Sequence, residues 1–338
     1  MPATATLALL GDLMLGGKVS RVLRDRPTEW IWGDVLPALR RVDAVLANLE
    51  SPITTCDERW SGGWKMFHFR ADPTAVDLLQ DGNVRCVSLA NNHILDFGHA
   101  GLADTVRHLG SAGIGHAGAG ADSAAASAPA IIDLPGLKVG MIAATDQMQS
   151  FAATAASPGT NHIVVGTDSP ALDAIAASVV ALRRDGVGTV VLSLHWGPNM
   201  RLRPRQRFRD FARAAIDRGI DIVHGHSAHV FHTVEVHRNG IILYDTGNFI
   251  DDYWNFWNFG SFWSFPFLHD DWSFVFLVDT VDGRPYRLRL LPVRTRPWPL
   301  SLATGRTFEA ITGRMVGLCK AIGTAVARTD EGLEIAIA

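Results

Sequence analysis

Three imidazoles follow a short apolar run in Asp221-Ile222-Val223-His224-Gly225-His226-Ser227-Ala228-His229-Val230. An apolar run that ends abruptly in polar side chains is typical of a buried strand in an α/β sheet, and ligands bind beyond the carboxyl ends of such strands. Buried imidazoles are costly unless they are paired or bind a metal, and neutral imidazole is the commonest metal ligand. We therefore expect a metal or catalytic site here, in which some of these histidines only orient the others.

Four upstream segments also place polar side chains where apolar runs end. They are Gly11-Asp12, Asn48-Leu49-Glu50, Asn91-Asn92-His93 with Asp96, and Ser193-Leu194-His195. Each alone has an ordinary explanation: a helix cap, a turn rich in Asn and Asp, or a core histidine with one hydrogen bond. Because the carboxyl ends of parallel strands meet at one edge of a sheet, we expect these segments and the three histidines to form one polar cluster.

Apolar, β-branched runs alternate with amphipathic segments up to about residue 220. This alternation predicts an α/β fold, with the following elements. We predict strands at 7–10, 44–46, 84–89, 139–143 and 189–194, and helices at 101–112, 169–184 and 205–218. Further on we predict a hairpin with Asn239-Gly240 in its turn, strands at 273–279 and 286–293, and a helix at about 305–324. The hairpins indicate two stacked sheets with helices outside, in one domain over residues 1–338, and the Ala/Ser/Gly stretch at 110–130 is read as a helix end plus a loop.

Composition excludes several classes of protein. The chain has 338 residues, 47% of them hydrophobic and 19% charged, so it can bury a large core. A net charge of -3 gives no basic excess for nucleic-acid binding. The start of the chain has neither a basic region nor an apolar stretch long enough for a membrane span, and three scattered cysteines do not make a disulfide framework. We expect a cytoplasmic protein without nucleic-acid or membrane partners.

The ordered set of motifs resembles that of the CapA family, named for poly-γ-glutamate capsule synthesis, over about residues 7–253. The motifs are Gly11-Asp12-Leu13-Met14-Leu15-Gly16, Asn48-Leu49-Glu50, Ala90-Asn91-Asn92-His93, His195-Trp196-Gly197, Gly225-His226-Ser227-Ala228-His229-Val230 and Thr246-Gly247-Asn248-Phe249. That family is part of the calcineurin-like metallophosphoesterase superfamily. The resemblance implies a four-layer αββα sandwich of two stacked mixed β-sheets, with a metal centre at the strand ends.

The resemblance also implies roles for individual residues. Metal binding is implied for Asp12, Glu50, Asn92, His195, His224 and His226, and an acid/base role for His93. The chain departs from the superfamily at Met14, where the first motif usually has a histidine, and at Asn48-Leu49-Glu50, which replaces the second acidic motif. The loss of a nitrogen ligand favours a single divalent ion, and the remaining oxygen ligands favour Ca²⁺ or Mn²⁺, with Mg²⁺ or Zn²⁺ also compatible.

An aromatic-rich segment at about 251–276 has no helical period. It contains Trp254, Trp257 and Trp263, and Asp251 and Asp252 stand at its start. We predict that it forms a lid or pocket in which these five residues bind substrate. The alternative is a set of aromatic rings that seals one end of the core.

Soluble members of the CapA-like group include metal-dependent epimerases of lasso precursor peptides, and this chain resembles them. The resemblance implies an isomerase that inverts a C-terminal, aromatic (Trp) residue of a ribosomally made precursor peptide. Acid/base catalysis is then expected from His93, His226, His229, Asp12 and Asp96. Two alternatives stay open. One is a metal-dependent phosphoester hydrolase or a CapA-like poly-γ-glutamate biosynthesis protein, and the other is a non-catalytic module that binds a peptide or polymer. The sequence leaves the oligomeric state open.

Overall fold

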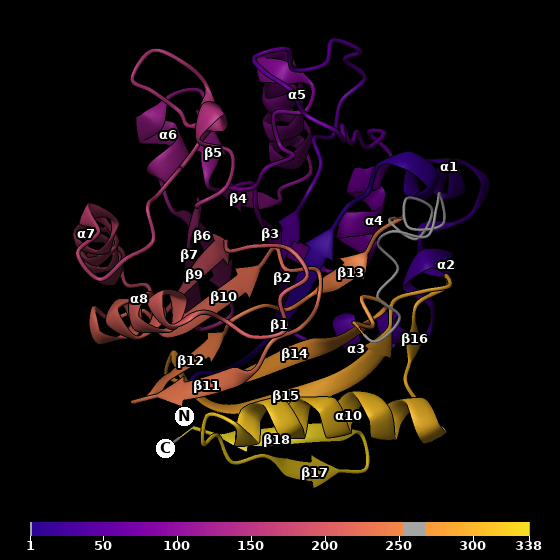
Figure 1. Cartoon of the computed structure of the whole chain (residues 1–338), viewed down its shortest axis with the longest axis vertical. Helices are drawn as coiled ribbons and strands as arrows, with labels where there is room; N and C mark the ends of the chain where they lie inside the picture. The colour runs from indigo at the N-terminus through magenta and orange to yellow at the C-terminus, as the bar shows by residue number, and fades with distance from the viewer. Residues whose placement is uncertain (1, 253–267, 338) are drawn as a thin grey trace.

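The computed structural model describes residues 2–252 and 268–337. Two mixed β-sheets stack face to face, and groups of helices cover the outer face of each sheet (Figure 1). The predicted four-layer α/β sandwich is therefore confirmed. Among the described residues no helix is both long and apolar enough to cross a lipid bilayer.

The first sheet combines a parallel half with an antiparallel half. Its strands in spatial order are β17 (Ala327–Thr329), β18 (Gly332–Ala336), β15 (Arg284–Arg294), β14 (Trp272–Val281), β1 (Thr4–Leu13), β2 (Ala44–Leu49), β3 (Val84–Ser88) and β4 (Gly115–Ala117). Two short strands join it, β13 (Asn248–Ile250) beside β1 and β16 (Ser301–Leu302) beside β15. From β1 to β4 the strands run parallel, so their carboxyl ends lie along one edge.

The second sheet has a parallel centre flanked by antiparallel strands. Its order is β11 (Val234–His237), β12 (Gly240–Leu243), β10 (Ile222–His226), β9 (Thr189–His195), β7 (Leu137–Thr145) and β6 (Ala130–Leu134). β12, β10, β9 and β7 are parallel to one another. A separate pair of two-residue strands joins β5 (Ala119–Gly120) to β8 (Gly159–Thr160).

The helices form the two outer layers. Over the first sheet lie α1 (Gly17–Asp25), α2 (Thr28–Trp32), the 3-10 turn η1 (Gly33–Val35), α3 (Leu36–Leu39), α4 (Ala75–Asp81) and α5 (Gly98–Ser111). Over the second sheet lie α7 (Pro170–Arg184) and α8 (Gln206–Asp217). The remaining described helices are α6 (Ser123–Ser127), η2 (Gln149–Phe151) and α10 (Gly305–Lys320), the last in the range predicted for a C-terminal helix. In Figure 1, α7 and α8 stand on one side of the sheets and α1, α2 and α4 on the other.

The alternation of side chains along β1 explains why the strands read as continuous apolar runs. Leu7 and Leu9 belong to the core between the two sheets, whereas Ala8 and Leu10 belong to the core under the outer helices. All four side chains are fully buried. A strand that is buried on both faces needs apolar residues at every position. Its sequence therefore lacks the alternation of apolar and polar residues that marks a half-exposed strand.

Two sequence predictions differ from the structure. The stretch 110–130 is not a helix end plus a plain loop, because after α5 it contains β4, β5 and α6. β4 forms there by pairing with β3, which is a tertiary contact that local composition does not encode. The predicted hairpin is present as β11 and β12, but Arg238 and Asn239 form its turn and Gly240 is already paired with His237.

Candidate metal centre

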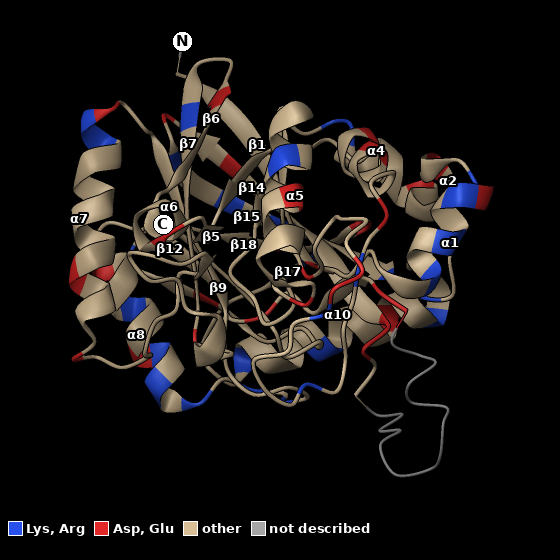
Figure 2. Cartoon of the chain, turned by 90° about the horizontal axis from the view of Figure 1, so that it is seen from above, with Lys and Arg blue, Asp and Glu red and all other residues tan. Residues whose placement is uncertain are grey.

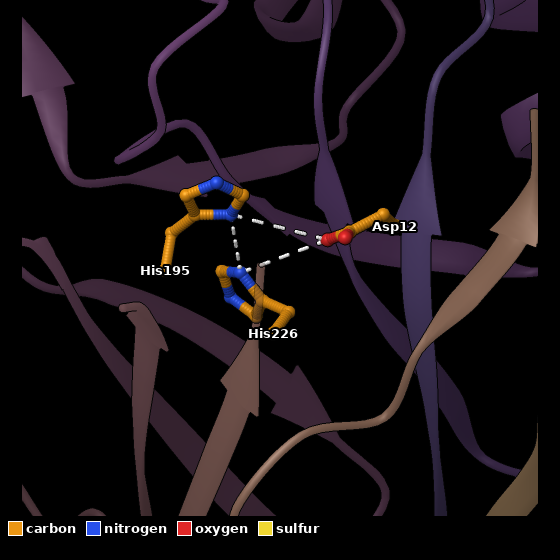
Figure 3. Close-up of side chains that lie close together, drawn as sticks. All are labelled: Asp12, His195 and His226. Atoms are coloured by element: carbon orange, nitrogen blue, oxygen red, sulfur yellow. Dashed lines mark hydrogen bonds and ion pairs between the residues drawn. The ribbon is translucent and has the colours of Figure 1, made fainter. Parts of the chain in front are cut away.

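Strand ends from both sheets bring a carboxylate and two imidazoles together. Asp12 lies near the end of β1, His195 ends β9 and His226 ends β10. His195 and His226 are direct neighbours in the parallel register, and their Nδ1 atoms are 2.9 Å apart. Asp12 Oδ1 lies 3.9 Å from His195 Nδ1 and 3.8 Å from His226 Nδ1 (Figure 3). Ligand atoms of the three residues are thus close enough to share one ion.

A second group shares Asp12 and adds side chains from two loops. Glu50 follows β2 and His229 follows β10, and ligand atoms of the two converge with the carboxylate of Asp12. His229 Nδ1 lies 3.6 Å from Asp12 Oδ2 and 2.9 Å from Asn248 Oδ1. His195 links the two groups, because its Nε2 lies 3.7 Å from Glu50 Oε1. The centre therefore has nitrogen and oxygen donors on both sides of Asp12.

The electrostatics of this cluster suit a cation. Burial, together with the nearby charges of Asp245 and Asp251, raises the pKa of Asp12 well above its usual value. Burial also lowers the pKa of His195 and His226 well below that of free histidine, so both rings are neutral and keep a lone pair. Oδ2 of Asp12 is buried and accepts no hydrogen bond from the described residues. A divalent ion would compensate the buried carboxylate and bind the neutral imidazoles, so the residues present fit such an ion.

Neighbouring polar groups hold the donors in place. Asn48 donates from Nδ2 to Asp12 Oδ1 at 2.8 Å, and the same nitrogen lies 3.3 Å from His195 Nδ1. Asn91 donates to Asn48 Oδ1 at 3.0 Å, which fixes the amide orientation. Ser193 Oγ lies 2.9 Å from His226 Nε2, which leaves Nδ1 of that ring facing Asp12. Such outer partners orient the ligands of metal sites and set their tautomers.

A buried acid/base group stands beside the centre. His93 Nδ1 lies 2.7 Å from Asp96 Oδ2, and both side chains are almost completely buried. Lys65 places its Nζ 3.1 Å from Asp96 Oδ1 and donates to the backbone oxygen of Asn92 at 2.7 Å. Burial lowers the pKa of His93 although Asp96 opposes the shift, so the ring is neutral near pH 7. With Nδ1–H donated to Asp96, Nε2 of His93 can accept a proton.

Comparison with known proteins shows the family of this chain. Residues 6–253 match the family model described as bacterial capsule synthesis protein PGA_cap. The chain belongs to this family. A probable polyglutamine synthesis accessory protein of Mycobacterium tuberculosis is 32% identical over 99% of this chain and 96% of its own length.

Two further relatives carry capsule-related names. The capsule biosynthesis protein CapA of Bacillus anthracis is 28% identical over 73% of this chain and 60% of its own length. The PGA biosynthesis protein CapA of Bacillus subtilis is 30% identical over 72% of this chain and 63% of its own length. A solved phosphatase structure from Mycoplasma pneumoniae aligns with a TM-score of 0.48 and 11% identity over 87% of this chain and 95% of that chain, which does not bear on function.

Met14 has a packing role in this PGA_cap protein. Its side chain is fully buried against Phe69, and the ring of Phe69 lies 4.5 Å from the His93 ring, centroid to centroid. Met14 therefore supports the ring of His93 indirectly, through its packing against Phe69.

Some residues predicted as ligands lie outside the two groups. His224 Nε2 lies 2.9 Å from the carbonyl oxygen of Leu10, and this ring belongs to neither group among the described residues. Oδ1 of Asn92 is buried and receives no hydrogen bond from the described part of the chain. His229, predicted as an acid/base group, lies beside Asp12 and Glu50.

The predicted substrate-binding residues are only partly within the described structure. Asp251 is buried and lies 3.6 Å from Arg296, and Asp252 accepts a hydrogen bond from the backbone of Lys18 at 2.8 Å. Both carboxylates therefore have partners within the fold. The predicted lid residues Trp254, Trp257 and Trp263 lie outside the described residues.

Sequence reasoning missed two residues of the centre. Lys65 lies in a segment without helical or strand period, and its lysine type alone does not distinguish it from surface lysines. Asn248 belongs to the motif Thr246-Gly247-Asn248-Phe249, but the motif alone does not predict a role for it. β13 pairs with β1, so Asn248 is opposite Asp12. The sequence feature that could have indicated Asn248 is its place directly after Gly247.

Proposed function

We propose that this protein is a divalent-metal-dependent enzyme that acts on an amide-linked glutamate polymer during capsule-type synthesis. The observation that carries the proposal is the pair of donor groups sharing Asp12, next to the hydrogen-bonded side chains of His93 and Asp96. A purely structural cluster would not need three neutral imidazoles around one desolvated carboxylate. The names of the relatives support the polymer, because they refer to capsule, PGA and polyglutamine synthesis.

The residues divide into two tasks. When bound, a divalent ion held by Asp12, His195 and His226, or by Asp12, Glu50 and His229, would polarise a substrate oxygen. His93 is the proton acceptor through Nε2, and Asp96 fixes the ring orientation and stabilises the imidazolium that forms. Lys65 forms an ion pair with the same carboxylate and holds Asp96 in place. Hydrolysis is the reaction that this layout supports, because His93 can take the proton of an attacking water.

The ion that we propose is Mn²⁺. Of the two donor groups, one has two imidazoles and one carboxylate, and the other has two carboxylates and one imidazole. Mn²⁺ accepts both nitrogen and oxygen donors, whereas Ca²⁺ and Mg²⁺ take oxygen ligands. Zn²⁺ also binds imidazole and carboxylate, usually with four ligands in all, and is therefore the nearest comparator. Ca²⁺, Mg²⁺ and Zn²⁺ are the comparators.

A second candidate is epimerisation of a peptide residue, the function that the sequence resemblance implied. The observation that favours it is a second buried imidazole, His229, which is oriented by Asn248 as His93 is by Asp96. Removal and return of a Cα proton from opposite faces needs two such groups. The names of the relatives favour the capsule-synthesis alternative over this one.

One pair of isotope experiments separates these functions. The EDTA-treated protein is given each ion and incubated with an oligo-γ-glutamate, with peptides ending in tryptophan, and with an aryl phosphodiester. Hydrolysis in H₂¹⁸O introduces the label into a new carboxyl group of the oligo-γ-glutamate, and this is the expected result. Deuterium at Cα with inversion in D₂O would establish the epimerase instead.

The matched variants are Asp12→Asn and His93→Gln, with Asp168→Asn in an exposed turn as the control. Turnover should be lost in the first two and kept in the third. Cleavage of the phosphodiester alone would replace the proposed substrate class. No turnover of any substrate with any ion would overturn the enzymatic proposal in favour of a binding module.

A further inference from the structure

We infer that residues 201–207, called the arginine loop below, bind consecutive carboxylates of an acidic polypeptide and hold that chain beside the metal centre. The inference deepens the proposed function and rests on it for the reaction that follows binding. It adds a binding surface that lies outside both donor groups. The surface and the centre can be tested separately.

The arginine loop carries unusual local charge. Arg201, Arg203, Arg205 and Arg207 alternate with other residues, and all four side chains are exposed. None of them lies within ion-pair distance of a carboxylate in the described part of the chain. Arg207 lies over the ring of Phe208 as a cation–π partner and interacts at longer range with the charge of Asp146. The whole protein has a net charge of -3, so this basic segment is a local exception.

The next two arginines along the chain, Arg209 and Arg213, form ion pairs that stabilise the fold, unlike those of the arginine loop. Arg213 donates to Glu235 Oε1 at 2.6 Å, and Arg209 lies 3.4 Å from the other oxygen of the same carboxylate. Glu235 in turn accepts a hydrogen bond from Tyr244 at 2.9 Å. The fold thus pairs Arg209 and Arg213 with Glu235, whereas the four arginines of the loop form no ion pair with the described residues. Like charges this close in the chain repel one another, and stability of the fold does not explain them.

Backbone contacts fix the arginine loop beside the centre. It follows β9 by a few residues, and β9 ends at the candidate ligand His195. Met200, just before the loop, donates its backbone N–H to the carbonyl of Ala228 at 2.9 Å, and Ala228 directly precedes His229. Arg201 accepts a hydrogen bond on its backbone oxygen from His232 Nε2 at 2.6 Å. In Figure 2 basic ribbon segments lie at and around α8, toward one side of the molecule.

The chemistry of the loop favours an acidic polypeptide over a nucleic acid. A guanidinium group pairs with a carboxylate through two parallel hydrogen bonds, and the four arginines offer several such sites in a row. Single-stranded nucleic acid also needs exposed aromatic rings on which bases stack. The rings next to the loop, Trp196, Phe208 and Tyr244, are at most 4% exposed. Among the described residues next to the loop, the surface supplies charge without exposed rings for stacking.

Fluorescence anisotropy with defined probes tests the inference. The probes are a labelled ten-residue γ-glutamyl peptide, its γ-glutaminyl counterpart without charge, and a ten-nucleotide oligothymidylate. The test variant is R201Q/R203Q/R205Q, in which side chains without ion pairs are replaced. The control is R85Q/R184Q/R306Q, which removes the same charge from exposed arginines near the start of β3, at the end of α7 and at the start of α10. Melting temperatures verify that both variants fold.

The test variant should bind the glutamyl peptide about tenfold more weakly than the wild type. This loss of affinity is expected when three exposed ion pairs between protein and peptide are removed. The control should bind within about twofold of the wild type, and the salt dependence of binding should fall only in the test variant. Equal losses in both variants would overturn the inference, as would equal binding of the glutaminyl peptide or tighter binding of the oligothymidylate.

The same assay with Asp12→Asn keeps the two proposals distinguishable. This variant should still bind the glutamyl peptide while it loses turnover. If peptide binding depends on the loop but no metal-dependent turnover is found, the inference stands and the proposed function fails. If turnover is found and the loop variant binds normally, the inference fails alone.

Discussion

Replacing Asp12 with asparagine separates the metal role of this residue from its structural role. Asparagine has the same shape and keeps an oxygen that can accept the 2.8 Å hydrogen bond from Asn48. It removes the charge that burial and neighbouring carboxylates disfavour in the metal-free protein. We therefore expect Asp12→Asn without metal to melt at the wild-type temperature or above it. Its response to added metal should be lost.

The size of that response follows from linkage. An ion present at 100 times its dissociation constant stabilises the folded state by about 2.7 kcal/mol. For 338 residues the entropy of unfolding is about 0.7 kcal/mol per kelvin, so the melting temperature should rise by about 4 °C. The neutral imidazoles of His195 and His226 need no deprotonation before they bind, whereas burial raises the pKa of Asp12, so the shift should grow as the pH rises.

The assay is calorimetry or thermal fluorescence with EDTA-treated protein, titrated with Mn²⁺ and each comparator ion. The control Asp168→Asn should keep the full shift. A shift of about 4 °C that survives in Asp12→Asn would refute the assignment of Asp12 as the shared ligand. A wild type that shows no shift with any ion would refute the metal centre as a whole.

Asp96→Asn should lower turnover by about 10² to 10⁴, as expected for loss of acid/base function at His93, while the metal-induced melting shift stays unchanged. Asp279→Asn should destabilise the protein by about 1–3 kcal/mol at pH 7. Burial raises the pKa of Asp279, but hydrogen bonds from two arginines and a threonine outweigh burial, so the pKa in the folded protein is below the usual value. The stabilisation by the Asp279 carboxylate is therefore present above about pH 4 and is lost as the pH falls through the folded-state pKa. The melting temperatures of wild type and variant should converge in acid. Gly11→Ala should abolish the metal shift, because a Cβ there overlaps the backbone of a neighbouring segment, whereas Gly317→Ala on an open helix face should raise the melting temperature by about 1 °C.

Much of the fold and the centre was predictable because the strands are buried on both faces. A continuous apolar run such as 189–194 that ends in His195 indicates both a central strand and the residue beyond it. The same reasoning located Asp12 and His226, and the structure brings ligand atoms of all three together. Parallel register explains why it succeeded, since strand ends in such sheets have a common edge.

Other features depend on contacts between distant segments. Lys65 reaches the centre through an ion pair with Asp96 across an irregular loop, and no sequence period marks that loop. β4 and β5 consist of glycine and alanine apart from His116, and these residues have weak strand propensity, so pairing with β3 and β8 decides their structure. His224 and His226 are two residues apart and lie on the same face of β10, so the sequence did not distinguish them. His224 lies one step further from the strand end, and its Nε2 contacts the carbonyl oxygen of Leu10.

The glycines before the ligands explain why the motifs read Gly-Asp and Gly-His. A side chain at Gly11 would overlap the carbonyl oxygen of Gly247, and one at Gly225 would overlap the carbonyl oxygen of Tyr244. The segment 244–247 therefore lies in close contact with both β1 and β10. The backbone N–H of Asp12 donates to the carbonyl of Gly247 at 2.9 Å, which locks this approach. Because Asp12 and His226 each follow one of these glycines, the close backbone contact draws the carboxylate and the imidazole toward one point. Gly11 and Gly225 thus allow the backbone contact that positions Asp12 and His226. The two ligand residues would not converge without these glycines.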